Sequence, residues 1–177
     1  MAISALDLFK IGVGPSSSHT MGPMLAGALF AERLAVSGGL EHVDGVRVEL
    51  FGSLAATGIG HATDRAVVAG LMGMRPDTVD PDAMADRVAA VAHDAALPLC
   101  GTRPVGFSWG RDLQLVRDAL PHHPNALRIV ALDGRTRDGL LAVWEACDPA
   151  SRAASAPTGC CPAGYGCGAA LPSCTGT

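Results

Sequence analysis

Residues 46–71 read VRVELFGSLAATGIGHATDRAVVAGL, and they predict a strand, a turn and a helix in direct succession. Apolar and polar residues alternate over 46–51, which indicates a strand with one buried face. Glycines punctuate the stretch up to His61, and a helical pattern of apolar residues follows over 62–71. Glycines permit tight turns and close approach of a ligand, and sites commonly lie beyond the carboxyl end of a strand. The turn would therefore direct its side chains toward a position where sites are common.

Three side chains of this turn, those of Thr57, His61 and Thr63, are candidates for the site. A histidine at a helix start has its charged form disfavoured by the helix dipole, which keeps the imidazole neutral and able to accept a proton. The alternative is that His61 merely caps the helix or binds the neighbouring Asp64. The residues alone leave both alternatives open.

A second polar cluster precedes this region, in residues 12–24, which read GVGPSSSHTMGPM. Hydroxyl side chains and glycine–proline pairs make a poor strand and a poor helix interior, whereas Pro23 suits the first turn of a helix reaching about Val36. A hydroxyl-rich loop before a helix N-terminus favours a carboxylate or phosphate ligand. The alternative is an ordinary loop with Thr20 as the helix cap. The density of hydroxyls favours a binding site made of Ser16, Ser17, Ser18, His19 and Thr20.

The composition of the 177 residues predicts one folded domain with a tail. The chain is apolar, with 17% charged residues and a mean hydropathy of +0.29, yet it contains no apolar run of membrane-spanning length. Its net charge of −4 provides no electrostatic basis for binding nucleic acid. The first residues lack the basic and apolar segments of a secretory signal, so we expect a cytoplasmic protein that associates with neither membranes nor nucleic acid.

Further short elements follow along the chain. We expect a helix that begins at Pro81 with Asp80 as its cap, and a brief helix over 113–120. Strands are expected at 97–100, 105–109 and 126–132. Short strands and helices without regular βα repetition predict an α+β fold, a small mixed sheet packed with helices, over residues 1–147.

Residues 148–177 differ in composition, because they consist almost wholly of Pro, Ala, Ser, Gly, Cys and Thr. Such a segment cannot offset its ordering entropy, so we expect a disordered or aberrant tail, left by truncation or a frame shift after Asp133. The cysteine spacing at this end of the chain matches neither a zinc ribbon nor a ferredoxin run, so no metal site is expected. These cysteines are Cys147, Cys160, Cys161, Cys167 and Cys174.

Three motifs give the chain a family resemblance over about its first 130 residues. DLFKIG at 7–12 continues into GPSSSHT at 14–20, LFGSLAATGIGHATD occupies 50–64, and a weaker HPN lies at 123–125. In this order and spacing they resemble the β chain, or N-terminal domain, of the iron–sulfur-dependent bacterial L-serine dehydratases (L-serine ammonia-lyases).

The resemblance implies a lyase of serine catabolism and gluconeogenesis, which converts L-serine through an aminoacrylate to pyruvate and ammonia. It implies that His61 is the catalytic base for the Cα proton. The loop from Ser16 to Thr20, with Thr57 and Thr63, would hold the substrate carboxylate or line its entrance. The family's [4Fe–4S] cluster supplies an open iron that acts as a Lewis acid on the substrate.

In the family, the cysteines that bind the cluster belong to a second, α half, which has no counterpart here. The resemblance therefore implies that this chain binds no cluster and is inactive alone. It would need an α half or α subunit as its partner, in a homo- or hetero-oligomer. Two alternatives stay open: a non-catalytic anion-binding regulatory module, like a related domain of some phosphoglycerate dehydrogenases, and an inactive truncated fragment.

Overall fold

The structure, a computed structural model, describes residues 13–121 and 123–134 and the backbone of 140–147. Its centre is a mixed six-stranded sheet in the order β2-β3-β1-β5-β6, with β4 also paired to β1. The expected α+β fold with a small mixed sheet is thereby confirmed, whereas the expected tail lies outside the described residues. The strands are β1 (Gly45–Gly52), β2 (Ala96–Leu99), β3 (Arg103–Gly106), β4 (Leu113–Val116), β5 (Asn125–Leu132) and β6 (Leu140–Cys147).

Strand β1 forms the middle of the sheet and brings its end to the start of β5. The two strands are antiparallel along their whole length, with Gly45 opposite Leu132 and Gly52 opposite Asn125. Strand β4 runs parallel to β1 on its other side, and β6 runs antiparallel to β5. The alternation of β1 directs Val46, Val48 and Leu50 into the main core. This register places the residue after β1 beside Asn125, which shapes the candidate site.

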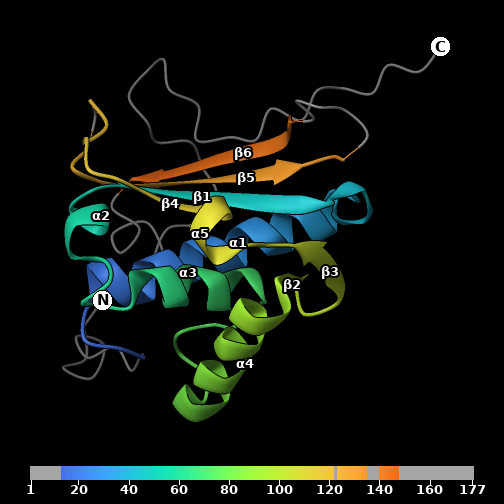
Figure 1. Ribbon diagram of the computed structural model, residues 1–177, viewed down its shortest axis with the longest axis horizontal. Helices are drawn as coiled ribbons and strands as arrows, with labels where there is room; N and C mark the ends of the chain where they lie inside the picture. Colours follow the sequence, from blue (N-terminus) through green and yellow to red (C-terminus); the bar gives the residue numbers. More distant parts are fainter. Residues whose placement is uncertain (1–12, 122, 135–139, 148–177) are drawn as a thin grey trace, which may run out of the picture.

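Helices cover one face of the sheet, and α1 (Gly22–Val36) runs beside α3 (Thr63–Leu71) beneath it (Figure 1). Their side chains share the buried core with those of β1. The amino ends of both helices lie at the same end of the molecule as α2 (Ser53–Thr57) (Figure 1). The remaining helices are α4 (Pro81–Asp94) and α5 (Trp109–Asp112). Among the described residues no helix combines the length and apolar character needed to cross a bilayer.

The helix starts confirm the turn and cap signals in the sequence. Proline lies in the first turn of α1, and the Asp80 side chain caps α4 by accepting a hydrogen bond from the Asp82 N–H. The expected strands at 97–100 and 126–132 correspond to β2 and β5.

Two expectations about the second half of the domain were wrong. The segment predicted as a helix over 113–120 begins instead with β4, since its backbone pairs in register with β1 and buries Leu113 beside Val48. The strand predicted over 105–109 is displaced, with β3 ending at Gly106 and Trp109 opening α5. For β4, pairing with the distant strand β1 outweighed local propensity, which is weak in such short segments. Strand β3 instead pairs with its neighbour β2 and ends at Gly106, before α5 begins.

Candidate functional site

The two polar clusters of the sequence meet at the amino ends of α1 and α3. A single π-helical turn, Ser17–Met21, leads into α1, and the glycine-rich turn leads into α3. Two hydrogen bonds join them: Thr20 Oγ1 donates to the His61 carbonyl at 2.9 Å, and Thr63 Oγ1 donates to the His19 carbonyl at 2.5 Å. Both threonines are buried. The loops therefore fix one another through reciprocal side-chain contacts.

The serine-rich loop is stabilised from within rather than by a cap on α1. The Ser16 side chain accepts a hydrogen bond from the His19 N–H at 3.2 Å, and its carbonyl accepts from Met21. Helix α1 begins after Met21 without a side-chain cap, so the alternative that Thr20 caps it is wrong. The Thr20 hydroxyl bridges to the other loop instead. π-Helical turns recur at functional sites, which is consistent with a binding role for this loop.

The imidazoles of His19 and His61 lie against one another, with ring centroids 5.2 Å apart and planes tilted by 44°. His19 Nδ1 lies 2.8 Å from Ser18 Oγ, and its Nε2 lies 3.0 Å from Ser53 Oγ. Ser53 Oγ donates its one proton to Asn125 Oδ1, so it must accept from His19 Nε2–H. In the neutral ring Nδ1 is then the acceptor, and the Ser18 hydroxyl donates to it. This tautomer follows from the hydrogen-bond network.

His61 has the opposite tautomer. Its Nδ1 lies 3.0 Å from the Thr57 carbonyl oxygen, which can only accept, so Nδ1 carries the proton. In the neutral ring Nε2 holds an unprotonated lone pair, and within the described part of the chain it has no hydrogen-bond partner. His19 is thus committed at both ring nitrogens, whereas His61 keeps one nitrogen available to accept a proton.

The pKa of His19 is lowered from its ordinary value. Burial is the largest cause, the neighbouring His61 adds to it, and a hydrogen bond with Ser53 opposes both. Protonation of His19 would place a positive charge in this partly desolvated position, which is costly. The His19 ring is therefore kept neutral at pH 7.

Three residues of the network were missed as site residues in the sequence: Ser53, His123 and Asn125. Gly52 has φ +56°, and a Cβ there would lie 2.2 Å from the Pro124 carbonyl, so glycine lets the end of β1 approach this segment. The Ser53 N–H donates to that carbonyl at 3.0 Å, and His123 Nδ1 accepts from the Asn125 N–H at 2.9 Å. The signal was present, since both segments belong to motifs quoted above.

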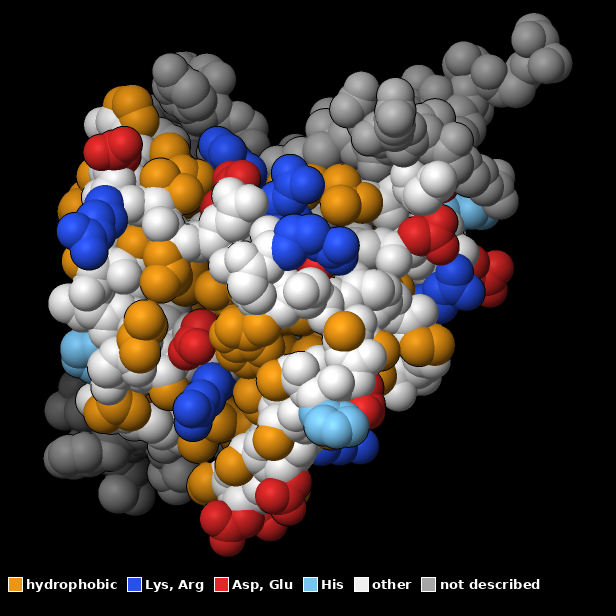
Figure 2. Space-filling view, in the orientation of Figure 1, with side chains coloured by type: hydrophobic (Ala, Val, Ile, Leu, Met, Phe, Trp, Pro, Cys, Tyr) orange, Lys and Arg blue, Asp and Glu red, His pale blue; other side chains and the backbone are white. Residues whose placement is uncertain are grey.

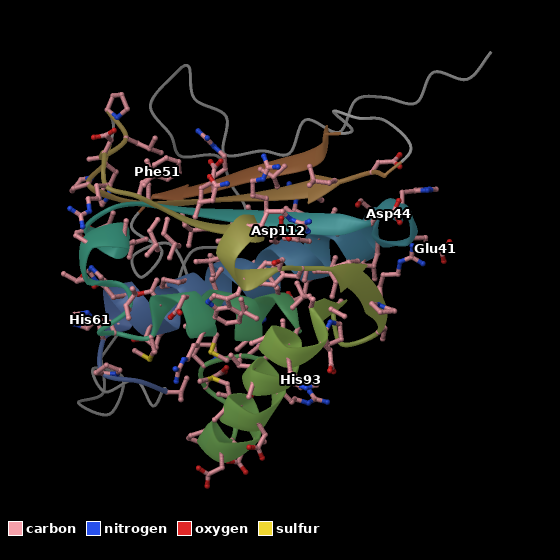
Figure 3. All side chains as sticks on the ribbon, viewed as in Figure 1. Glu41, Asp44, Phe51, His61, His93 and Asp112 are labelled. Carbon is pink, nitrogen blue, oxygen red and sulfur yellow. The ribbon has the colours of Figure 1, made fainter. Side chains whose placement is uncertain are left out.

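All eight predicted residues come from these two loops, but they differ in exposure. Ser17 and Thr57 are exposed, and the side chains of Ser16, Ser18, His19 and His61 are half-buried. Thr20 and Thr63 are buried with their hydroxyls committed to backbone carbonyls, so the contacts observed for them position the loops. Figure 3 shows His61 at the end of the molecule where α2 and the starts of α1 and α3 meet.

The two loops of the candidate site carry no acidic or basic side chains apart from His19 and His61. Residues 11–31 and 50–63 contain no Asp, Glu, Lys or Arg. Within the described residues no group of three His, Cys, Asp or Glu side chains could hold a metal ion, and the described side chains include one thiol, that of Cys100. The described residues therefore do not include a cysteine set that could ligate a [4Fe–4S] cluster.

Comparison with known proteins identifies the family. Residues 4–143 match the family described as serine dehydratase beta chain, and the chain belongs to this family. It is 48% identical over 145 residues to the L-serine dehydratase of Streptomyces coelicolor, which covers 81% of this chain. It is 44% identical over 134 residues, 75% of the chain, to the L-serine dehydratase TdcG of Escherichia coli. The corresponding enzyme of Helicobacter pylori is 40% identical over 134 residues, 76% of the chain.

These relatives are much longer proteins. The aligned part spans 32% of the Streptomyces coelicolor enzyme, 30% of TdcG and 29% of the Helicobacter pylori enzyme. Membership of a dehydratase family is therefore established for this chain, and it agrees with the resemblance expected from the motifs. About two thirds of each relative has no counterpart in the match.

Proposed function

We propose that this chain is the β part of an L-serine ammonia-lyase, in which His61 accepts the substrate Cα proton at a site completed by an α half. The α half would hold the [4Fe–4S] cluster, as the resemblance implies. The chain's own contribution is a preorganised cluster of neutral hydrogen-bonding groups around one available imidazole nitrogen.

The orientation of His61 carries this proposal. Its Nδ1 is engaged by the Thr57 carbonyl, and its Nε2 lone pair is left without a partner among the described residues. A general base needs its accepting nitrogen free and its ring fixed. The Thr20 hydrogen bond to the His61 backbone and the contact with the His19 ring supply that fixation.

The neutral surroundings of the candidate site suit the carboxylate of an amino-acid substrate but not its ammonium group. Exposed hydroxyls such as that of Ser17 offer donors to a carboxylate. No acidic side chain occurs in 11–31 or 50–63 to pair with the substrate ammonium group. A completed site would draw that partner from elsewhere, in keeping with an active site shared between two halves.

The contact between the two imidazoles favours the enzyme over the regulatory alternative. An anion-binding module requires only the serine loop near Ser17 and assigns no role to His61. The structure instead joins the two loops by two buried threonine hydroxyls. Such cross-linking is expected where relative position within a fraction of an ångström matters.

The test uses a chimera, the Streptomyces coelicolor L-serine dehydratase in which the matching segment is replaced by that of this chain. Pyruvate formation from L-serine is measured under anaerobic conditions. His61→Asn retains a donor near the Nδ1 position and removes the proton acceptor. We expect kcat to fall about 100-fold or more, with unchanged thermal stability. His93→Ala is the matched control, because His93 is highly exposed on α4 and should leave kcat unchanged.

Full activity of the His61→Asn chimera would refute the catalytic role. A fall of similar size in His93→Ala would show that histidine loss acts through folding rather than through the site.

A further inference from the structure

Ile59 is an exposed apolar side chain in the middle of the candidate site. Ile59 lies two residues before His61, and the residue is 73% exposed. Among the described residues the other large apolar side chains with marked exposure are Val36 and Leu115. Single exposed apolar residues are normal on protein surfaces, so exposure alone assigns no function. The setting of Ile59 distinguishes it from the other two.

The turn that carries Ile59 is held in one conformation. The Ala62 N–H donates to the Ile59 carbonyl at 3.2 Å, and the Thr63 N–H donates to the Gly58 carbonyl at 2.8 Å. A Cβ on Gly58, the C-cap of α2, would lie 2.1 Å from the Leu54 carbonyl, so glycine is needed for the backbone to turn this closely at the end of the helix. Ile59 is therefore presented outward by a fixed backbone, and little entropy remains to be lost when a partner covers it.

The turn itself is uncharged, since residues 50–63 contain no Asp, Glu, Lys or Arg, and the first charged residues after it are Asp64 and Arg65 on α3. In Figure 2 a pale blue histidine at the left edge has white and orange atoms beside it, and the nearest red and blue groups lie farther along the same face. Charged residues are depleted in the cores of interfaces, whereas apolar anchors are seated there. The exposed residues of the two loops are Gly14, Pro15, Ser17, Ala56, Thr57, Ile59 and Gly60.

We infer that Ile59 is an anchor residue, which inserts into an apolar pocket on the part of the dehydratase that this chain does not span. This inference rests on the proposed function, which already requires another half to complete the site. The Streptomyces coelicolor relative has the necessary length, because the match covers 32% of it. Seating Ile59 would bring a covering surface close to His61, two residues farther along the same turn, and exclude water there.

The test compares amide hydrogen exchange at residues 57–61 in this chain alone and in the Streptomyces coelicolor chimera described above. We expect slower exchange at these amides in the chimera, because the turn becomes covered. Ile59→Asn should abolish this extra protection and lower kcat/KM about tenfold or more, while leaving the melting temperature of the chain alone unchanged. Ile59→Leu should retain both protection and activity.

Val36→Asn is the matched control, since Val36 is 89% exposed at the far end of α1 from the site. It should change neither protection nor kcat/KM. Equal exchange at 57–61 in the chain and the parent chimera would overturn the inference, as would a protected and fully active Ile59→Asn chimera. If either of these results were obtained while the His61→Asn chimera remained inactive, the proposed function would stand and only the inference about Ile59 would fail. An active His61→Asn chimera would remove the proposed function whatever the exchange at Ile59 showed.

Discussion

Helices α1 and α3 contact one another in two regions, along their length and through the loops that precede them. The two contacts differ in chemistry. Along their length they approach through glycines, so that backbone touches backbone: a Cβ on Gly27 would lie 2.6 Å from the Val67 carbonyl. At their amino ends the loops before them meet through hydroxyls and imidazoles. The first contact is apolar and fixes the distance between the helices. The second is polar and depends on that distance, because a hydrogen bond tolerates little displacement.

The glycine contact between α1 and α3 holds the domain together, whereas the hydrogen bonds between the loops position the side chains of the candidate site. Loss of the glycine contact should disturb both regions of contact, whereas loss of a hydroxyl at the loops should disturb the site and leave the helices in place. The expected effects on stability therefore differ in size.

Gly70→Ala should have the largest effect. A Cβ at this position would lie 1.9 Å from the Met24 carbonyl and 3.0 Å from the Ala28 nitrogen, both of them backbone atoms that cannot move aside alone. We expect the free energy of unfolding to fall by about 3 kcal/mol or more, the upper range for overpacking. Urea unfolding followed by circular dichroism measures it.

Gly110→Ala is the control for this substitution. Gly110 lies in α5 with open space where its Cβ would be, and alanine favours a helix over glycine. Its stability should stay within about 1 kcal/mol of the parent. Similar losses in the two variants would contradict the assigned importance of close helix approach.

Thr63→Val should have an intermediate effect, confined to the loops. Valine keeps the shape of the side chain and removes the hydroxyl that donates to the His19 carbonyl. Leaving a buried acceptor unsatisfied costs about 1–3 kcal/mol. Thr57→Val is the matched comparison, because its hydroxyl bond to the Ser53 carbonyl is exposed, and its cost should be about 0.5 kcal/mol or less.

Nuclear magnetic resonance spectra distinguish a local effect from a global one. Thr63→Val should shift amide signals around His19 and His61 and leave those of the sheet unchanged. Shifts spread evenly through β1 and β5 would show that this hydroxyl supports the whole domain instead.

The same contrast explains how far the sequence could predict the molecule. Alternation over 46–51 and the proline of α1 are local signals, and they identified β1 and that helix. The strand β4 escaped prediction because it exists by pairing with β1, a partner more than 60 residues away in sequence. Local propensity in four residues cannot report such a pairing.

The sequence indicated both loops of the candidate site, but the prediction of the hydrogen-bond network around them was incomplete. Hydroxyl density and glycine spacing indicated both loops, and the structure joins them by two hydrogen bonds, whereas the functional roles of their residues stay predictions. Ser53 and Asn125 were missed, because their contact depends on the register that sets Gly52 opposite Asn125. The committed hydroxyls of Thr20 and Thr63 were likewise not deducible, because a threonine that faces a ligand and one that binds a backbone look alike in sequence.

His19→Gln should have the smallest effect, visible in the pH dependence of stability. The folded chain lowers the pKa of His19, chiefly through burial, so the unfolded chain takes up that proton first as pH falls. This contribution is fully present above the ordinary histidine pKa of about 6.5 and is lost as pH falls from there toward the lower folded value. Urea unfolding at several pH values between 7.5 and 5 should show a shallower decline for His19→Gln than for the parent.

His61→Asn tests the contribution of the neighbouring ring to the lowered pKa of His19. Burial is the first cause of that lowering, and His61 is the second. Removing the neighbouring imidazole should raise the pKa of His19 only part of the way to its ordinary value. The decline of stability with falling pH should then lie between those of the parent and His19→Gln. A His61→Asn curve that runs parallel to that of the parent, with His19→Gln still shallower, would show that the two rings do not sense one another. The polar contact between the loops before α1 and α3 would then rest on its two threonine hydrogen bonds.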